Sequence, residues 1–329
     1  MMRLTAKQIL SRHDKALTKK EDFRSLYDEA YEFALPQRNL YDGYYDGGVG
    51  GQNKMNRVFD STAINSTQRF ANRMQSGIFP PQRNWCRLEP GSDIPLDRKQ
   101  EAQRALDMYT ETFFDTLKQS NFDIAIGEFL LDLSVGTAVM MVQPGDDVNP
   151  INFIPVPQYL VAFEEGADGK VDNVYRRIRI KGEAIQRQWP EATIPEKIQI
   201  QIDNKPTEDV ELIEATVYDD KRGDYCYHVI HKGTNEEILY KRMSYSPWIV
   251  ARYAKVAGEI YGRGPLITAL PDIKTLNKTV ELQLKNASLS ISGVYTAADD
   301  GVLNPNTVRI MPGAIIPVAR NGGPQGESL

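Results

Sequence analysis

The residues best suited to metal or acid–base chemistry are few in this sequence and widely spaced. The densest group is Cys226, His228 and His231, which lie in one largely apolar segment. If this segment is a β-strand, Cys226 and His228 project from one face and His231 from the other, because side chains alternate along a strand. The remaining histidine, His13, is far away in the sequence. Ligands of zinc must converge on one centre, so this spacing favours a structural strand over a metal site.

Three adjacent carboxylate pairs beside or near glycine are interpreted as turns: Asp146-Asp147, Glu164-Glu165 and Asp219-Asp220. A calcium site built from Glu164, Asp168 and Asp172 is disfavoured, because the loop pattern with a closing glutamate is missing. The nucleophile-elbow, Walker-loop and H-E-x-x-H motifs are absent from the sequence. We therefore expect no enzyme, no cofactor and no metal, although an unrecognised carboxylate pair stays an alternative.

The bulk composition is that of an ordinary globular protein. The chain has 329 residues and two cysteines, Cys86 and Cys226, whose separation excludes a C-x-x-C zinc site and is typical of free thiols in a reducing compartment. We expect neither a signal peptide nor a membrane span, because long apolar runs are missing. The formal net charge of -5 argues against tight binding of nucleic acid, which is driven by basic residues.

Helices are predicted through the first part of the chain. Thr5 and Gln8 form a capping box for the first helix, which should end before Pro36. A second helix is expected over residues 61–78 and a third over 96–119, with Asn121 as the N-cap of a fourth. The apolar spacing predicts that the last two helices bury one face each, made of Ala102, Leu106, Tyr109, Phe113 and Leu117, and of Ile124, Phe129, Leu130 and Leu133.

The middle of the chain changes to the period of a β-sheet. Short apolar runs separated by Gly, Asp, Asn and Pro predict an antiparallel sheet, interrupted by a brief helix at 182–188. The expected strands are 138–142, 152–154, 159–163, 174–180, 210–218, 225–231 and 249–253. Helices followed by antiparallel strands make the fold class α+β.

A long amphipathic helix is expected from Pro271 to about Ser290, within the stretch 258–290. Gly262, Gly264 and Pro265 introduce a short helical turn, and Pro271 suits the first turn of a second helix about 30 Å long. One stripe of this helix is apolar: Ile273, Leu276, Val280, Leu284 and Ala287. A separate stripe is charged at i, i+3 and i, i+4 spacing: Lys274, Lys278, Glu281 and Lys285. Beyond it, residues 291–329 show short β-like runs between turns and a Gly-rich end, which predicts a piece of a longer polypeptide.

Two blocks of sequence resemble the portal (head–tail connector) proteins of short-tailed bacteriophages. The first contains residues 35–38 (LPQR), 59–62 (FDST) and 75–81 (QSGIFPP), followed by Trp85. The second contains residues 258–265 (GEIYGRGP) and 269–277 (ALPDIKTLN), and is similar to the family's entry into its stem helix. The resemblance extends along the whole chain, and the second block is specific to this family.

The resemblance implies a phage portal fold assembled into a ring, usually dodecameric, at one capsid vertex of the virion. Residues 1–257 would form the wing, with a helical layer over 1–135 and an antiparallel β-rich part over 136–257. Residues 258–290 would form the first stem helix, and 291–329 an incomplete clip. The second stem helix, tunnel loop and crown of the family would lie beyond residue 329.

The resemblance also implies a channel for DNA packaging and ejection. The partners would be further copies of the chain, the terminase large subunit, a tail adaptor, the major capsid and scaffolding proteins, and double-stranded DNA that passes without sequence preference. Assembly would take place in the host cytoplasm, and a net-acidic chain suits a channel through which DNA slides. The alternative is a tail or collar adaptor that never lines a channel.

Within this fold, three sets of residues are candidates for contacts. Ile273, Leu276, Val280 and Leu284 would pack between stems, and Val294, Tyr295, Arg309 and Arg320 of the clip would dock the motor or adaptor. The charged set of Lys274, Lys278, Glu281 and Lys285 would touch DNA, pair with a neighbouring subunit or stay solvated. We favour the latter two slightly, because Glu281 already offers Lys278 and Lys285 partners on its own helix.

Overall fold

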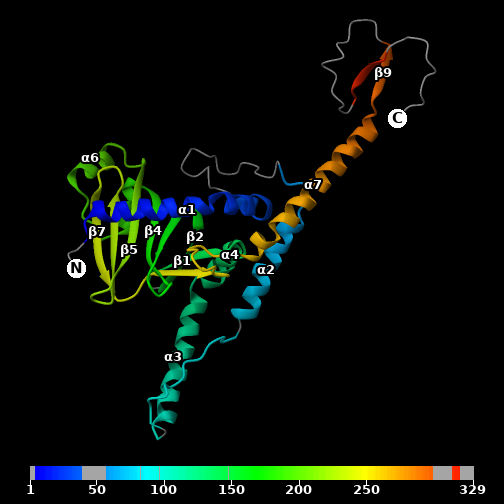
Figure 1. Cartoon of the computed structure of the whole chain (residues 1–329). Coiled ribbons are helices and arrows are strands. Elements are labelled where there is room, and N and C mark those ends of the chain that lie inside the picture. The colour runs from blue at the N-terminus through cyan, green and yellow to red at the C-terminus, as the bar shows by residue number, and fades with distance from the viewer. Residues whose placement is uncertain are drawn as a thin grey trace. The chain divides into compact units, whose positions relative to one another are not determined.

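The computed structural model describes residues 4–38, 57–81, 83–95, 97–146, 148–298 and 313–318 (Figure 1). The chain divides into two compact units, one made of Met1–Lys54 and Thr62–Leu270 and the other of Met55–Ser61 and Pro271–Leu329. Within the described ranges, the helices are all too short or too polar to cross a lipid bilayer. Helices and mainly antiparallel strands occur together, so the expected α+β class is confirmed.

The helices of the first unit follow the predicted order. They are α1 (Ala6–Ala34), α2 (Thr62–Ile78), α3 (Lys99–Gln119) and α4 (Phe122–Val135). The capping box of α1 is confirmed, because the Gln8 N–H donates to Thr5 Oγ1 at 3.4 Å and the Thr5 N–H donates to Gln8 Oε1 at 2.9 Å. The helix ends before Pro36, which starts a short 3-10 turn, η1 (Pro36–Arg38).

The predicted buried face of α3 is wrong in part. Tyr109 and Phe113 are 60% and 43% exposed, whereas Thr110 and Phe114 are buried. The reason is an extended segment (residues 83–95) that contacts the polar side of the helix. Its Leu88 N–H donates to Thr110 Oγ1 at 3.2 Å, a polar contact that the hydrophobic pattern does not show, while Phe114 packs in the apolar cluster with α4.

Asn121 occupies the predicted N-cap position of α4 without capping it. Its side chain instead pairs with the backbone of Phe153, accepting from N–H at 2.8 Å and donating to the carbonyl at 2.7 Å. Ser120 Oγ accepts the Phe122 N–H at 3.2 Å. Ile124, expected in the core, is 74% exposed.

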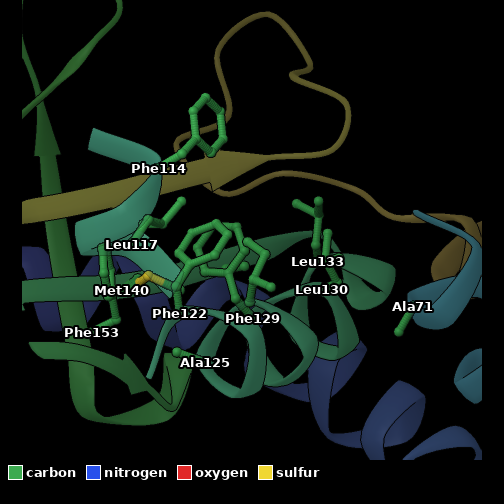
Figure 2. Close-up of a cluster of buried hydrophobic side chains, with 12 residues drawn as sticks. Ala71, Phe114, Leu117, Phe122, Ala125, Phe129, Leu130, Leu133, Met140 and Phe153 are labelled. Carbon is green, nitrogen blue, oxygen red and sulfur yellow. The ribbon is translucent and has the colours of Figure 1, made fainter. Parts of the chain in front are cut away.

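A three-stranded antiparallel sheet packs on α4. It has the order β2 (Ile151–Val156), β1 (Thr137–Pro144), β8 (Trp248–Arg252), with Val139 opposite Val156 and Ala138 opposite Ala251. Burial of apolar side chains between helix and sheet stabilises this core (Figure 2). Its labelled members are Ala71, Phe114, Leu117, Phe122, Ala125, Phe129, Leu130, Leu133, Met140 and Phe153.

A second, five-stranded antiparallel sheet lies against α1 (Figure 1). Its strands in order are β3 (Val161–Glu165), β4 (Val171–Lys181), β5 (Asp209–Asp219), β6 (Asp224–His231) and β7 (Glu236–Met243). Ile9 and Ala16 of α1 pack on Tyr175, Ala215 and Ile230. The sequence analysis predicted one sheet, whereas the structure has two of them in this part of the chain. It also missed β7, because the charged residues of this strand obscure the alternation of apolar and polar residues. It also missed α6 (Glu196–Asn204).

Short helical segments connect these strands. They are η2 (Gln158–Leu160), η3 (Gly182–Ala184) and α5 (Ile185–Gln188). Residues 159 and 160, expected at the start of a strand, belong to η2. The brief helix expected over residues 182–188 is confirmed as η3 followed by α5.

The long helix α7 (Pro265–Ser292) is continuous. The expected start of a separate helix at Pro271 is wrong, since Pro271 lies inside α7. A proline inside a helix removes one backbone hydrogen bond and strains the preceding turn. The helix continues through Pro271 because the other backbone hydrogen bonds of its 28 residues remain. In the second unit, β9 (Tyr295–Ala298) and β10 (Ile315–Val318) pair in parallel.

Candidate functional site

The glycine block that precedes α7 is held in the first unit by its backbone. The Gly262 N–H donates to Thr137 Oγ1 at 2.8 Å, and the Tyr27 hydroxyl donates to the Gly262 carbonyl. Two residues further on, the Gly264 N–H donates to the Val135 carbonyl at 2.8 Å. The start of α7 is therefore bonded to the junction between α4 and β1.

Close backbone contact explains why these positions are glycine. A Cβ on Gly262 would lie 2.5 Å from the carbonyl oxygen of Gly136, and a Cβ on Gly264 would lie 2.1 Å from that of Ser134. Each distance is shorter than a van der Waals contact, so a side chain would separate the two segments. We call Gly136, Gly262 and Gly264 the glycine joint.

Aromatic rings fill the space beside the glycine joint. Tyr261 is fully buried, and its ring centroid lies 5.3 Å from those of Phe23 and Phe163. The Tyr27 ring meets it edge-on at 6.4 Å. Burial raises the pKa of Tyr27 to about 12, so its hydroxyl is neutral and remains a donor at physiological pH.

A network of ion pairs connects β3 to the end of β8 and to the loop between β8 and α7. Glu165 pairs with Arg252 and, at 2.8 Å, with Lys255. Burial alone would raise the pKa of Glu165, but the hydrogen bonds from Lys255 and Arg252 outweigh it and hold the pKa below its ordinary value. The prediction that Glu164-Glu165 form a turn is wrong, because both residues lie in β3. Glu164 accepts a hydrogen bond from the Tyr175 hydroxyl at 2.9 Å.

Apolar side chains of α7 are exposed in the second unit. Leu276 and Leu284 of the predicted apolar stripe are 43% and 55% exposed, and Ile273 and Val280 are half-buried. Leu282, which the sequence analysis did not single out, is 54% exposed and lies on the opposite side of the helix. Large apolar side chains exposed together in this way are typical of a surface that contacts another protein.

The charged stripe of α7 contains a triad of ion pairs. Glu281 pairs with Lys278 at 2.9 Å and with Lys285 at 2.5 Å. Hydrogen bonds from Lys285 and Lys278 lower the pKa of Glu281. Both lysines have an intrahelical partner, as their spacing predicted. Lys274 lies one turn before Lys278, and its side chain is exposed as well.

A short segment is bound to α7 through one buried amide. Asn277 Oδ1 accepts the N–H of Phe59 at 2.7 Å and that of Asp60 at 3.2 Å, and its Nδ2 donates to the Arg57 carbonyl at 2.8 Å. We call this arrangement the Asn277 clamp. It brings Phe59-Asp60 of the first sequence block together with the helix that follows the second block.

The candidate docking residues after α7 are only partly described. Val294 and Tyr295 are 39% and 61% exposed at the start of β9. Arg309 and Arg320 lie outside the described residues. The predicted β-like run at 314–318 is confirmed as β10, and residues 308–310 fall outside the described ranges.

The residues considered for metal binding have partners within the five-stranded sheet. His228 Nδ1 lies 2.5 Å from a Glu237 carboxylate oxygen, and His231 Nδ1 lies 3.0 Å from the Thr234 hydroxyl. Cys226 instead lies near Asp219 and Asp224, a grouping that the sequence did not indicate.

A guanidinium group occupies this acidic grouping. Arg242 donates to both carboxylate oxygens of Asp224, at 2.5 and 2.6 Å, and lies 3.5 Å from an oxygen of Asp219. The positive charge of Arg242 compensates the negative charges of Asp219 and Asp224, as a bound metal cation would otherwise do.

Comparison with known proteins identifies a family for the chain. Residues 6–328 match the family described as bacteriophage head to tail connecting protein. A probable portal protein of Bordetella phage BPP-1 is 25% identical over 285 residues, which cover 82% of this chain and 50% of that protein. The chain thus spans about half the length of this relative. Since the family match extends over nearly all of the sequence, including the glycine joint and the Asn277 clamp, the chain belongs to the bacteriophage head-to-tail connecting proteins.

Proposed function

We propose that this protein is a portal subunit, which assembles into a closed ring at one capsid vertex and forms the channel for DNA packaging and ejection. Residues 1–257 form the wing, 258–290 the first stem helix, and 291–329 part of the clip. The ring is a homo-oligomer, most simply a dodecamer. The BPP-1 relative, a probable portal protein, supports this assignment.

The exposed apolar surface of α7 is the observation that carries the proposal. Full burial of a leucine or isoleucine side chain stabilises a protein by about 1.5–3 kcal/mol, and Leu276 and Leu284 keep roughly half of their surface in water. A neighbouring copy supplies the missing contacts if each α7 packs against the next. Such a head-to-tail interface generates a ring when its rotation closes.

The glycine joint supports the stem assignment because it anchors the first residues of α7 within the first unit. Backbone hydrogen bonds from Gly262 and Gly264 and the ring cluster around Tyr261 restrict the start of α7. The buried contacts at this point suit a helix that serves as a stem.

The charge of α7 suits a surface past which DNA slides. In the triad, Glu281 neutralises part of the charge of Lys278 and Lys285, which leaves a weak positive band when the helix is repeated around a ring. DNA passing such a band is held loosely and without sequence preference.

The clip is proposed to dock the terminase large subunit during packaging and the tail adaptor afterwards. Val294 and Tyr295 are exposed on its described part, and Arg309 and Arg320 are further candidates in the sequence. Major capsid and scaffolding proteins would surround the wing at the capsid vertex of the virion.

Assembly tests this proposal directly. Light scattering on the protein expressed from its complete reading frame should give one large species, and negative-stain images should show rings with a central hole. Leu284→Glu should shift the protein toward smaller species, because a charge replaces an apolar contact. Val148→Glu changes a 75% exposed residue outside the helix and is the matched control.

Two results would contradict the proposal. A monomer at every concentration would exclude the ring, and a compact particle without a central hole would instead indicate a tail or collar adaptor. Equal effects of Leu284→Glu and Val148→Glu would show that α7 is not the assembly surface.

A further inference from the structure

The outer face of α2 is basic and carries no carboxylate. Arg69 and Arg73 are exposed one helical turn apart, and Arg83 is exposed shortly after the helix ends. Within the part of the chain that the structure describes, these three guanidinium groups have neither an ion pair nor a side-chain hydrogen bond. Arg87 differs from them because it forms a bidentate pair with Asp107.

The sequence around α2 makes this lack of carboxylates unusual. Residues 61–88 contain no aspartate or glutamate, although the whole chain has 44 in 329 residues. At that average a segment of this length would carry about four. The acidic residues that would ordinarily compensate the arginines are therefore missing from the segment.

The arrangement also acts against the stability of the helix. Two like charges at i, i+4 spacing repel each other and destabilise a helix slightly, whereas opposite charges stabilise it. The Lys278–Glu281–Lys285 triad of α7 has the stabilising pattern, and Arg69 and Arg73 have the repulsive one. Helix formation alone gives no reason for this pair.

The neutral residues on the same face suit a phosphate partner. Asn65, Ser66, Gln68, Asn72 and Ser76 are exposed beside the two arginines, and the opposite face is buried through Ala63, Thr67 and Ala71. Contacts to DNA phosphates come from Arg and Lys, from Ser, Thr, Asn, Gln and Tyr side chains, and from backbone N–H groups. The exposed face thus consists of neutral polar side chains and positive charge. Within it, Gln68 Nε2 donates to Asn72 Oδ1 and the Ser76 hydroxyl donates to the Arg73 carbonyl.

We infer that the outer face of α2, with Arg69, Arg73 and Arg83, binds the phosphate backbone of double-stranded DNA without sequence preference. The inference rests on the proposed function for the identity of the polyanion. It assigns DNA contact to a surface of the first unit, separate from the lysines of α7. Binding is weak for one subunit and is multiplied when subunits assemble.

The test measures DNA binding as a function of salt. Fluorescence anisotropy with a short random-sequence duplex compares the unaltered protein with the Arg69→Gln/Arg73→Gln variant. We expect about tenfold weaker binding at low salt, and a slope of log K against log[salt] that falls by about 2, near 0.9 for each lost phosphate contact. Arg69→Lys/Arg73→Lys should keep the slope, because it keeps both charges.

The matched control is Lys15→Gln/Lys19→Gln. These two lysines are exposed on α1 at the same i, i+4 spacing, so the variant removes the same charge from another helix face. It should leave both affinity and slope nearly unchanged. An equal loss in the control would show diffuse charge attraction and overturn the inference, as would unaltered binding by the arginine variant.

Light scattering on the same samples separates this inference from the proposed ring. Arg69→Gln/Arg73→Gln should not change the subunit number. A changed subunit number with unaltered DNA binding would assign the face to a neighbouring copy and overturn the inference. Absence of rings in the unaltered protein would contradict the proposed function, while salt-dependent binding through these arginines would still stand.

Discussion

The side chain of Asn277 takes the place of a backbone partner for Phe59. Its Oδ1 accepts the Phe59 N–H at 2.7 Å, although the two residues are 218 positions apart in the sequence. Asn277 itself is only 8% exposed. A segment without regular secondary structure is thereby fixed to the middle of a long helix.

Replacement of this amide should release the segment. Asn277→Leu leaves the N–H groups of Phe59 and Asp60 and the Arg57 carbonyl without their partner, and a buried unsatisfied group costs about 1–3 kcal/mol. We expect amide hydrogen exchange at Phe59 and Asp60 to accelerate. Asn277→Asp keeps the acceptor and should protect both amides better than leucine does. Equal exchange in all three proteins would contradict a role for the clamp.

The glycine joint should be intolerant of even a methyl group. Gly262→Ala places a Cβ against the Gly136 carbonyl oxygen, which is backbone and cannot rotate away, so we expect a loss of about 1–3 kcal/mol or more in the free energy of unfolding. Urea denaturation measures this loss. Gly77→Ala is the control, because nothing lies within 4 Å of its Cβ, and it should stabilise α2 by roughly 0.5–1 kcal/mol. A Gly262→Ala protein as stable as the unaltered chain would show that the contact is not tight.

Lys20 should make the free energy of unfolding vary with pH between about 7 and 10. Its side chain is buried, and its Nζ donates to the carbonyls of Gln158 and Tyr159 at 3.0 and 2.6 Å. Burial lowers the pKa of Lys20 to about 7 from 10.5. Between these values the unfolded chain binds more protons than the folded one, so the free energy of unfolding rises with pH, by up to about 1.4 kcal/mol per unit.

The Lys20→Met variant isolates this effect. The stability of the unaltered protein relative to Lys20→Met should increase from pH 7 to pH 10 and level off at lower pH, as measured by urea denaturation across that range. Lys19→Met removes an exposed lysine one residue earlier and is the control. A difference that does not vary with pH would mean that Lys20 keeps its proton in the folded state.

One triple variant distinguishes the possible roles of the three α7 lysines. Lys274, Lys278 and Lys285 are changed together to Gln, which is slightly shorter, keeps a hydrogen-bond donor and removes the charge. If they touch DNA, rings should form normally while packaging or genome retention becomes abnormal and loses salt sensitivity. If they pair across an interface, the rings should weaken or change subunit number. Normal assembly with normal packaging would leave a solvated face.

Local sequence signals predicted the parts of the fold that depend on neighbouring residues. The capping box of Thr5 and Gln8, the end of α1 before Pro36 and the pairing of Glu281 with both lysines depend on residues at most four positions apart. Such patterns are visible in the sequence because helix geometry fixes which neighbours meet.

The errors concern residues whose partners are distant. Asn121 has the side chain of an N-cap but binds Phe153, and Glu165 has the setting of a turn residue but pairs with Arg252. For the candidate site, the sequence indicated Gly262, Gly264 and the apolar stripe, but it indicated neither their contacts nor the part played by Gly136. The close approach of Gly262 to Gly136 depends on tertiary packing, and the local pattern of apolar and polar residues does not indicate it.

The glycine joint also has a consequence for how this protein tolerates change over evolutionary time. Side-chain contacts can drift, since a smaller residue on one side is offset by a larger one opposite. Gly136 and Gly262 have no such freedom, because the two carbonyl oxygens and the hydrogens at the alpha carbons already fill the space between them. Neither partner can enlarge to compensate for the other. Substitutions elsewhere should therefore be followed by compensating changes while this pair persists, and a recombination between relatives should remain functional only when both glycines come through together.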